Sequence, residues 1–142
     1  MSGRILAVDP GEKRLGIALS DPTGTLASPL TVVKHVSRMV DAALIAQMAA
    51  EHEAVRIIIG AALDDDNQPT PQSRHAERLA EAVRQQCSLP VELWDESGST
   101  QDARASRIAM GVSRRKRSGH LDEVAAAVIL QSYLDAKASG TA

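Results

Sequence analysis

Three places in the sequence carry carboxylates where an α/β protein would assemble a site. Asp9 follows the apolar run Ile5–Val8, Asp95 and Glu96 follow another short apolar segment, and Asp122 opens a helical pattern. Sites in α/β sheets assemble at strand ends, so these groups converge if the two strands are near each other. Converged carboxylates repel unless a cation lies among them, and Mg²⁺ or Mn²⁺ prefers such oxygen ligands. The pattern therefore predicts a metal site of Asp9, Asp95, Glu96 and Asp122, suited to phosphodiester hydrolysis.

Each of these carboxylates also has a simpler interpretation. Asp9 can begin an Asp-Pro-Gly turn, and Asp122 can be a first-turn acid favoured by the helix dipole. Asp95 and Glu96 can begin a solvated loop. Any one of them is weak evidence for a site, and it is their joint placement in the inferred fold that favours the metal centre.

Positive charge gathers close to these acids in the sequence. Lys13 and Arg14 follow Asp9. A basic loop before Asp122 contains Arg114, Arg115, Lys116 and Arg117. Such cations can clamp a phosphate backbone without reading its bases, although a run of this kind can also be a solvated surface loop. We interpret all six as candidate substrate-binding residues.

The composition is that of one globular domain. The chain has 142 residues, a formal net charge of −2, 44% hydrophobic residues and 24% charged residues. This charge balance excludes a histone-like or polybasic protein. One Trp, one Tyr and no Phe argue against modules that stack single-stranded bases on rows of aromatic rings. With Cys87 as the only cysteine, an intramolecular disulfide and a cysteine zinc cluster are both impossible.

Motifs of several other protein classes are missing from the sequence. The four histidines form no His-Glu-x-x-His pattern, which argues against a zinc hydrolase, and the phosphate-binding loop of P-loop NTPases is absent. The N-terminus does not resemble a signal peptide, and no apolar run approaches the roughly 20 residues that span a bilayer. We therefore expect a cytoplasmic protein without a membrane partner.

The hydrophobic patterns predict an α/β domain with a mixed sheet. Strands are expected at 5–8, 15–19, 26–33, 55–59 and 91–94, and helices at about 37–52, 71–87, 100–111 and 121–136. The first three strands form a meander, and each later strand follows a helix. No linker or repeat divides the chain, so residues 1–142 are expected to form one domain with a flexible tail from about 137 to 142.

Capping and breaking residues fix several of these elements. Ser37 is the expected N-cap of the first helix, and Thr70 and Pro71 fit the N-cap and first residue of the second. Pro29 cannot donate to a neighbouring strand, so the strand at 26–33 is expected at an edge. The residues expected to face inward from the two helices are Val40, Leu44, Ile45, Met48, Leu79 and Val83.

Two segments resemble a known family. The segment Asp9–Asp21 (DPGEKRLGIALSD) closely resembles the opening of the YqgF/RuvX family, and Leu121–Leu134 is similar to its final helix. The similarity runs over nearly the whole chain in the right order. It implies an RNase H-like fold related to Holliday-junction resolvases, with a three-stranded antiparallel meander, two parallel strands and flanking helices. It also implies a nuclease that matures the 5′ end of 16S ribosomal RNA in bacteria.

The resemblance assigns catalytic roles to three residues. Asp9 matches the acid of the family's first strand, Glu96 the acid of its Asp-Glu-Arg motif, and Asp122 the acid of its last helix. Ser97 and Gly98 replace the usual Arg-Leu, so a fixed cation beside the site is lost.

Several functions remain open at this point. The leading hypothesis is a Mg²⁺- or Mn²⁺-dependent nuclease that acts on an RNA precursor, in contact with ribosomal assembly intermediates. A second is a resolvase of branched DNA, whose paired cuts favour a homodimer over a monomer. A third is a non-catalytic RNA- or ribosome-binding factor. The Asp-x-Gly hairpin also resembles the phosphate loop of actin-like and sugar kinases, but those enzymes close two such domains around ATP.

Overall fold

The computed structural model describes residues 3–61, 68, 70–95 and 117–138, with the backbone alone for residues 117–123. The strands are β1 (Arg4–Pro10), β2 (Arg14–Ser20), β3 (Ala27–Lys34), β4 (Ala54–Ala61) and β5 (Val91–Asp95). The helices are α1 (Arg38–Glu51), α2 (Pro71–Arg84) and α4 (Arg117–Ala138). All five expected strands are thus present, and the helix expected at about 100–111 lies outside the described residues.

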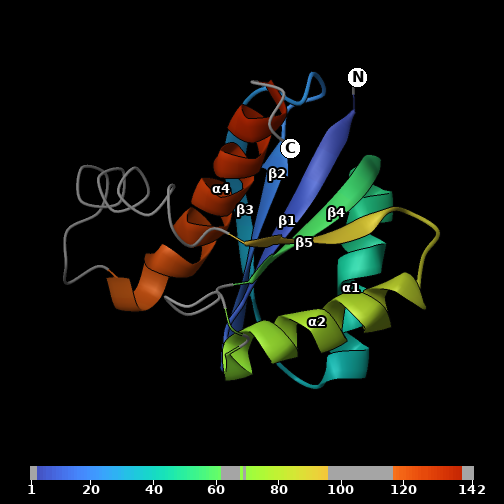
Figure 1. The fold of residues 1–142 in the computed structure, drawn as a ribbon, viewed down its shortest axis with the longest axis vertical. Coiled ribbons are helices and arrows are strands. Elements are labelled where there is room, and N and C mark those ends of the chain that lie inside the picture. Colours follow the sequence, from blue (N-terminus) through green and yellow to red (C-terminus); the bar gives the residue numbers. More distant parts are fainter. Residues whose placement is uncertain (1–2, 62–67, 69, 96–116, 139–142) are drawn as a thin grey trace.

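The five strands form one mixed sheet in the order β3-β2-β1-β4-β5 (Figure 1). β1 pairs antiparallel with β2, and β2 pairs antiparallel with β3. β4 lies parallel to β1 on its other side, and β5 lies parallel to β4. The predicted meander with two added parallel strands is confirmed, and it makes β1 the central strand.

The edge position expected for β3 is also confirmed. β3 pairs with β2 alone, and Pro29 lies beside a register irregularity between Ile17 and Ala18. A proline has no N–H to donate to a ladder, so an irregular edge strand accommodates it best.

Helices cover the two faces of the sheet separately. Figure 1 shows α4 on one face and α1 with α2 on the other. Under α4, the sheet presents the fully buried residues Ala7, Ala18 and Ile58. The two alanines let the helix approach the central strands closely, because they add little side-chain bulk between helix and sheet.

The start of α1 agrees with the sequence, but its buried face differs by one position. The Ser37 side chain accepts a hydrogen bond from the Val40 N–H, as expected of an N-cap. Val40 is nevertheless 49% exposed, whereas Asp41 beside it is buried. The prediction that Val40 faces the core is therefore wrong. Asp41 turns inward because it accepts a hydrogen bond from the Val36 N–H at 3.1 Å and contacts the Nδ1 of His35.

The second helix begins as predicted. The Thr70 side chain accepts from the Ser73 N–H at 3.0 Å, the Ser73 side chain accepts from the Thr70 N–H at 2.8 Å, and Pro71 opens the helix. Leu79 and Val83 are fully buried, as their spacing indicated.

The last helix is longer than predicted at both ends. α4 begins at Arg117 instead of about residue 121 and ends at Ala138 instead of about 136. Apolar periodicity marks only the part of a helix that packs on a core, so a polar first turn leaves no such signal. The rest of the expected tail lies outside the described residues. Within the part of the chain that the structure describes, no helix has the length and apolar character needed to cross a bilayer.

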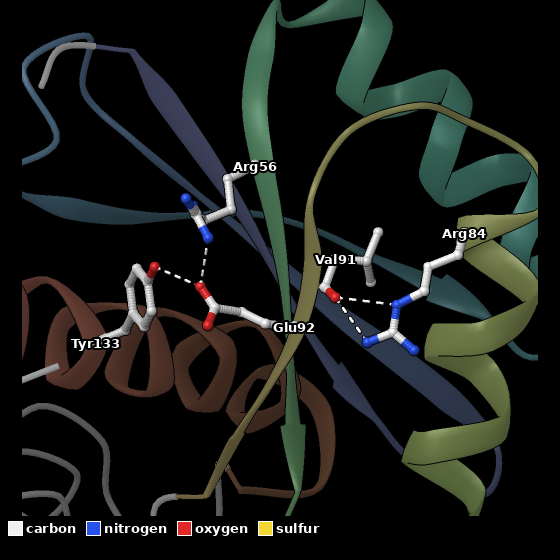
Figure 2. Close-up of polar contacts among 5 residues, drawn as sticks. All are labelled: Arg56, Arg84, Val91, Glu92 and Tyr133. Carbon is white, nitrogen blue, oxygen red and sulfur yellow. Dashed lines mark hydrogen bonds and ion pairs between the residues drawn. The ribbon is translucent and has the colours of Figure 1, made fainter.

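Polar contacts fix α4 against the far edge of the sheet. Tyr133 donates a hydrogen bond to Glu92 on β5 at 2.6 Å, and the same carboxylate pairs with Arg56 on β4 at 2.7 Å (Figure 2). Burial and this hydrogen bond raise the pKa of Tyr133 to about 12. The Trp94 ring lies edge-on to Tyr133, and its N–H donates to Ser132 at 3.0 Å. These contacts set the position of α4 along the sheet.

Candidate active site

Asp9 is a residue of the central strand. It pairs with Gly16 of β2 in the antiparallel ladder and is partly exposed. Side chains alternate between the faces of a strand, and Ala7 is buried under α4, so Asp9 projects from the same face. Because β1 continues to Pro10, the simpler interpretation of Asp9 as the first residue of a turn is wrong. The carboxylate lies at the carboxyl end of β1, on the α4 face.

A tight turn places two cations beside this strand end. The Gly11 N–H donates to the carbonyl of Arg14 at 2.9 Å. A Cβ at Gly11 would lie 2.5 Å from that same oxygen, so only glycine fits this turn. Lys13 and Arg14 are exposed, as a phosphate-binding role requires. The segment that resembles the family opening therefore forms a compact hairpin that carries two acids, Asp9 and Glu12, and two cations, Lys13 and Arg14.

Lys34 is a cation of this region that sequence reasoning missed. It is the last residue of β3 and the direct partner of Arg14 in the β2–β3 ladder. Both side chains share the sheet face of Gly16, and therefore the face of Asp9. No sequence signal could have found Lys34, because its position depends on the register of an irregular edge strand.

The backbone of Asp122 belongs to α4, beyond the first turn of that helix. The interpretation of Asp122 as a first-turn acid is therefore wrong. At the other end of α4, Leu134 and Lys137 line a cavity together with Gly3, which precedes β1. α4 thus runs opposite to β1 (Figure 1), and the half of the helix that contains Asp122 lies toward the carboxyl end of β1.

The carboxylates after β5 are placed differently. Asp95 is the last residue of β5 and pairs with Ala61 of β4. It lies four positions after the buried Val91, so the two side chains share one face of the strand. Val91 packs in the core beneath α1 and α2, so strand alternation points Asp95 to that face. Asp9 and Asp95 therefore project from opposite faces of the sheet. Glu96 lies outside the described residues.

The predicted basic loop is only partly described. Arg114, Arg115 and Lys116 lie outside the described residues. Arg117 is the first residue of α4, so the prediction that it belongs to the loop is wrong. Its polar surroundings hid the helix start from an analysis of apolar spacing.

A divalent metal ion fits the part of the site that the structure describes. Among the described side chains, no group of three His, Cys, Asp or Glu residues could hold a metal ion. Asp9 nevertheless offers hard carboxylate oxygens at a partly exposed strand end, and the α4 backbone brings Asp122 toward that end on the same face.

Solved structures share this fold. RuvC of T. thermophilus in complex with a Holliday junction substrate matches with a TM-score of 0.60 and 15% identity, over 98% of this chain and 97% of that one. The fowlpox virus Holliday junction resolvase matches with a TM-score of 0.56 and 16% identity, over 94% and 99% of the two chains. At these identities the likeness concerns the fold alone, and it confirms the predicted RNase H-like fold.

Sequence relatives cover almost the whole chain. A protein of Syntrophus aciditrophicus is 40% identical over 133 residues, which span 94% of this chain and 89% of that protein. A protein of Myxococcus xanthus is 37% identical over 94% of this chain and 88% of that protein. Both are described as "Putative pre-16S rRNA nuclease". The family model described as "RuvX: Holliday junction resolvase" matches residues 3–136. The chain therefore belongs to the RuvX family, as the segments Asp9–Asp21 and Leu121–Leu134 predicted.

Proposed function

We propose that this protein is a hydrolytic nuclease that cuts phosphodiester bonds with the help of Mg²⁺ or Mn²⁺. The observation that carries this proposal is the setting of Asp9. Its carboxylate lies at the end of the central strand, on the sheet face that also presents Arg14 and Lys34. An acid that can hold a metal, beside cations that can hold phosphates, is an arrangement suited to phosphodiester hydrolysis.

Asp9, Glu96 and Asp122 are the residues that would hold the metal. When bound, the ion would activate water and stabilise the charge on the leaving oxygen. Asp95 is left out of this set, because strand alternation turns it to the opposite face of the sheet.

Lys13 and Arg14 would bind the backbone of the substrate, together with the basic residues Arg114, Arg115, Lys116 and Arg117. Contacts of this kind position a nucleic acid without reading its bases. The protein therefore has to select its substrate class by the shape of the nucleic acid or through a further partner.

The relatives favour ribosomal RNA as that substrate. Proteins that are 37–40% identical over nearly the whole chain carry the name of a pre-16S rRNA nuclease. We accordingly assign this protein to the 5′-end processing of 16S precursor RNA, in contact with ribosomal assembly intermediates and in the cytoplasm. A resolvase of branched DNA is the second candidate, favoured by the description of the family model. A resolvase would be expected to act as a homodimer, because its substrate needs two paired cuts.

A cleavage assay with two substrates tests the proposal. A 5′-extended fragment of 16S precursor RNA and a four-way DNA junction are each incubated with the protein in Mn²⁺, in Mg²⁺ and in EDTA. Cleavage of the RNA alone, abolished by EDTA, is the expected result. Cleavage of the junction alone would transfer the assignment to the resolvase. Binding of RNA without cleavage in any metal would identify a non-catalytic RNA-binding factor and contradict the nuclease.

A further inference from the structure

The end of β3 connects the two faces of the sheet. Lys34 projects from the face of Asp9, so strand alternation turns the next residue, His35, to the face covered by α1 and α2. There the Nδ1 of His35 contacts the buried carboxylate of Asp41 in the first turn of α1. The ring of His75 on α2 lies edge-on to the His35 ring, with 6.0 Å between the ring centroids. The His35 side chain therefore contacts both helices.

The carboxylate of Asp41 is directed at the segment that precedes its helix. One oxygen contacts His35, and the other accepts a hydrogen bond from the Val36 N–H at 3.1 Å. The helix start already has a cap, because the Ser37 side chain accepts from the Val40 N–H. Burial of a carboxylate is costly unless it is hydrogen-bonded, and the Asp41 side chain is only 3% exposed. Both oxygens of Asp41 thus serve to fix His35 and Val36 at the end of β3.

The backbone of His35 extends this attachment to the candidate active site. Its N–H donates to the carbonyl of Lys13 at 2.9 Å, one residue beyond the pairing of Arg14 with Lys34. Lys13 belongs to the tight turn that precedes β2. Printed contacts therefore run without a gap from Asp41 through His35 to this turn.

The turn and the end of β3 line a groove of about 510 Å³. Among the described residues, its lining contains three cations, Lys13, Arg14 and Lys34, together with the acid Glu12 and with His35. Three cations against one acid leave the groove positive, which suits a phosphate backbone. Charged side chains lose less freedom on binding when the backbone that carries them is already fixed. The contacts of His35 fix the backbone on both sides of this groove.

We propose that His35 and Asp41 are positioning residues of the nuclease, which hold the Lys13 carbonyl and the end of β3 so that the cations of the groove stay directed at the substrate phosphates. His35 acts through the backbone of Lys13, and Asp41 acts through His35. The pair therefore contributes to the affinity for nucleic acid and leaves the bond-breaking step to the residues around Asp9. The inference rests on the proposed nuclease function and extends it.

Binding and cleavage of the 5′-extended RNA fragment by variants of His35 test this role. Affinity is measured by fluorescence anisotropy in EDTA, and KM and kcat are measured in Mn²⁺. His35→Ala removes the imidazole, whereas His35→Asn returns a short side chain with an N–H group. His52→Ala is the matched control, because it makes the same change at the other end of α1. Thermal unfolding of each variant establishes that it is folded at the temperature of the assay.

His35→Ala should weaken RNA binding in EDTA and raise KM by about 10-fold, the lower end of what the loss of a group that orients a ligand-binding side chain costs. Its kcat should be unchanged. His35→Asn should restore most of the affinity, and His52→Ala should bind as the wild type does. In a Lys13→Gln protein the effect of His35→Ala should be smaller, because the two changes act on the same contact.

Wild-type affinity in a folded His35→Ala protein would overturn the positioning role and leave the nuclease assignment standing. A loss that His35→Asn does not reduce, and that adds fully to the loss from Lys13→Gln, would also overturn it, because a merely structural residue gives that pattern. If His35→Ala does not fold, His35→Phe replaces it, since Phe keeps a ring and lacks the nitrogen. Wild-type affinity in His35→Phe would then overturn the role.

The binding arm separates this inference from the proposed function. A wild-type protein that binds the RNA in EDTA and cleaves it in no metal would contradict the nuclease. The affinities of the His35 variants would then still decide whether His35 positions the groove. A wild-type protein that does not bind the RNA would overturn both proposals.

Discussion

Arg14 and Lys34 are direct partners in the β2–β3 ladder, and both project from the sheet face that carries Asp9. Like charges at directly opposite positions of a sheet destabilise it. Such a pair lowers the stability of the sheet locally, and locally unfavourable pairs are expected at sites where a protein binds its ligand. The pairing of Arg14 with Lys34 therefore supports a role of these two residues in the proposed phosphate contact.

Replacement of Lys34 should separate these two effects. Lys34→Gln removes the repulsion from Arg14, so the free energy of unfolding should rise by about 0.2–1 kcal/mol. The same change should lower the salt slope of RNA binding by about 0.7–0.9, because one phosphate contact is lost. Urea unfolding and anisotropy titrations at several salt concentrations measure the two quantities. An unchanged slope would exclude a phosphate contact by Lys34.

Gly11 should tolerate no larger residue. A Cβ at this position would lie 2.5 Å from the carbonyl oxygen of Arg14, which is backbone and cannot move aside without distorting the turn. Gly11→Ala should therefore lower the free energy of unfolding by about 1–3 kcal/mol. It should also weaken nucleic-acid binding, since the turn positions Lys13 and Arg14. A Gly11→Ala protein with wild-type stability and affinity would show that the turn is not constrained in this way.

The hydrogen bond between Tyr133 and Glu92 should contribute measurably to stability. Tyr133→Phe keeps the ring against Trp94 and removes only the hydroxyl that donates to Glu92 at 2.6 Å. Because the Glu92 side chain is 38% exposed, water can partly replace the donor, and a loss of about 1 kcal/mol is expected.

The pKa of Tyr133 gives this contribution a pH dependence. The pKa is raised to about 12 in the folded protein, so the contribution is complete below the unfolded value near 10 and is lost as the pH rises through about 12. Urea unfolding of both proteins at pH 8 and pH 9 should give the same difference. A difference that already vanishes at pH 9 would contradict the assigned hydrogen bond.

Asp21 should make the stability of the β2–β3 turn depend on acid. Its carboxylate accepts hydrogen bonds from the Thr23 hydroxyl and from the N–H groups of Leu26 and Thr25, which lower its pKa from 3.8 to about 2. Because the pKa of Asp21 is lower in the folded protein than in the unfolded protein, its ionised carboxylate stabilises the fold at pH values above the unfolded pKa. This stabilisation is lost as the pH falls through about 2.

The variant Asp21→Asn should therefore have a lower Tm than the wild type at pH 7. The gap should narrow as the pH falls from about 4 toward about 2, where the wild-type carboxyl also becomes neutral. Thermal unfolding at pH 7, 4 and 2.5 measures this gap. A gap that is constant over this range would contradict the role of the ionised carboxylate.

The sequence predicted those parts of the fold that local chemistry determines. Ser37 and Thr70 cap their helices as expected, because a side-chain oxygen that accepts from the first turn needs no tertiary partner. Pro29 marked the edge strand for an equally local reason. Val40 was misplaced because Asp41 gains a buried hydrogen bond and a histidine contact that only the folded chain provides.

The site was less accessible to sequence reasoning than the fold. The position of Asp9 at the end of a buried strand was visible in the apolar run before it. Asp95 projects from the other face of the sheet because of its place in the alternation of side chains along β5. That place is set by the parallel register of β5 with β4. The pairing of Lys34 with Arg14 depends on a register that shifts within β3. Both features depend on pairing between strands that are far apart in the sequence, so neither could be predicted from composition or from residue spacing.

Cleavage of 5′-extended 16S precursor RNA by the variant Asp9→Asn tests the proposed metal-dependent active site most directly. The substitution preserves the shape of the side chain and removes the negative charge that would hold a metal ion. Asp135→Asn is the matched control, since it makes the same chemical change at an exposed position near the other end of α4. In Mn²⁺, the wild type and Asp135→Asn should cleave the RNA at equal rates. Asp9→Asn should remain folded, with unchanged or slightly raised stability through relief of carboxylate repulsion, and should not cleave. Cleavage by Asp9→Asn at the wild-type rate would contradict the assignment of Asp9 as a metal ligand and with it the proposed active site.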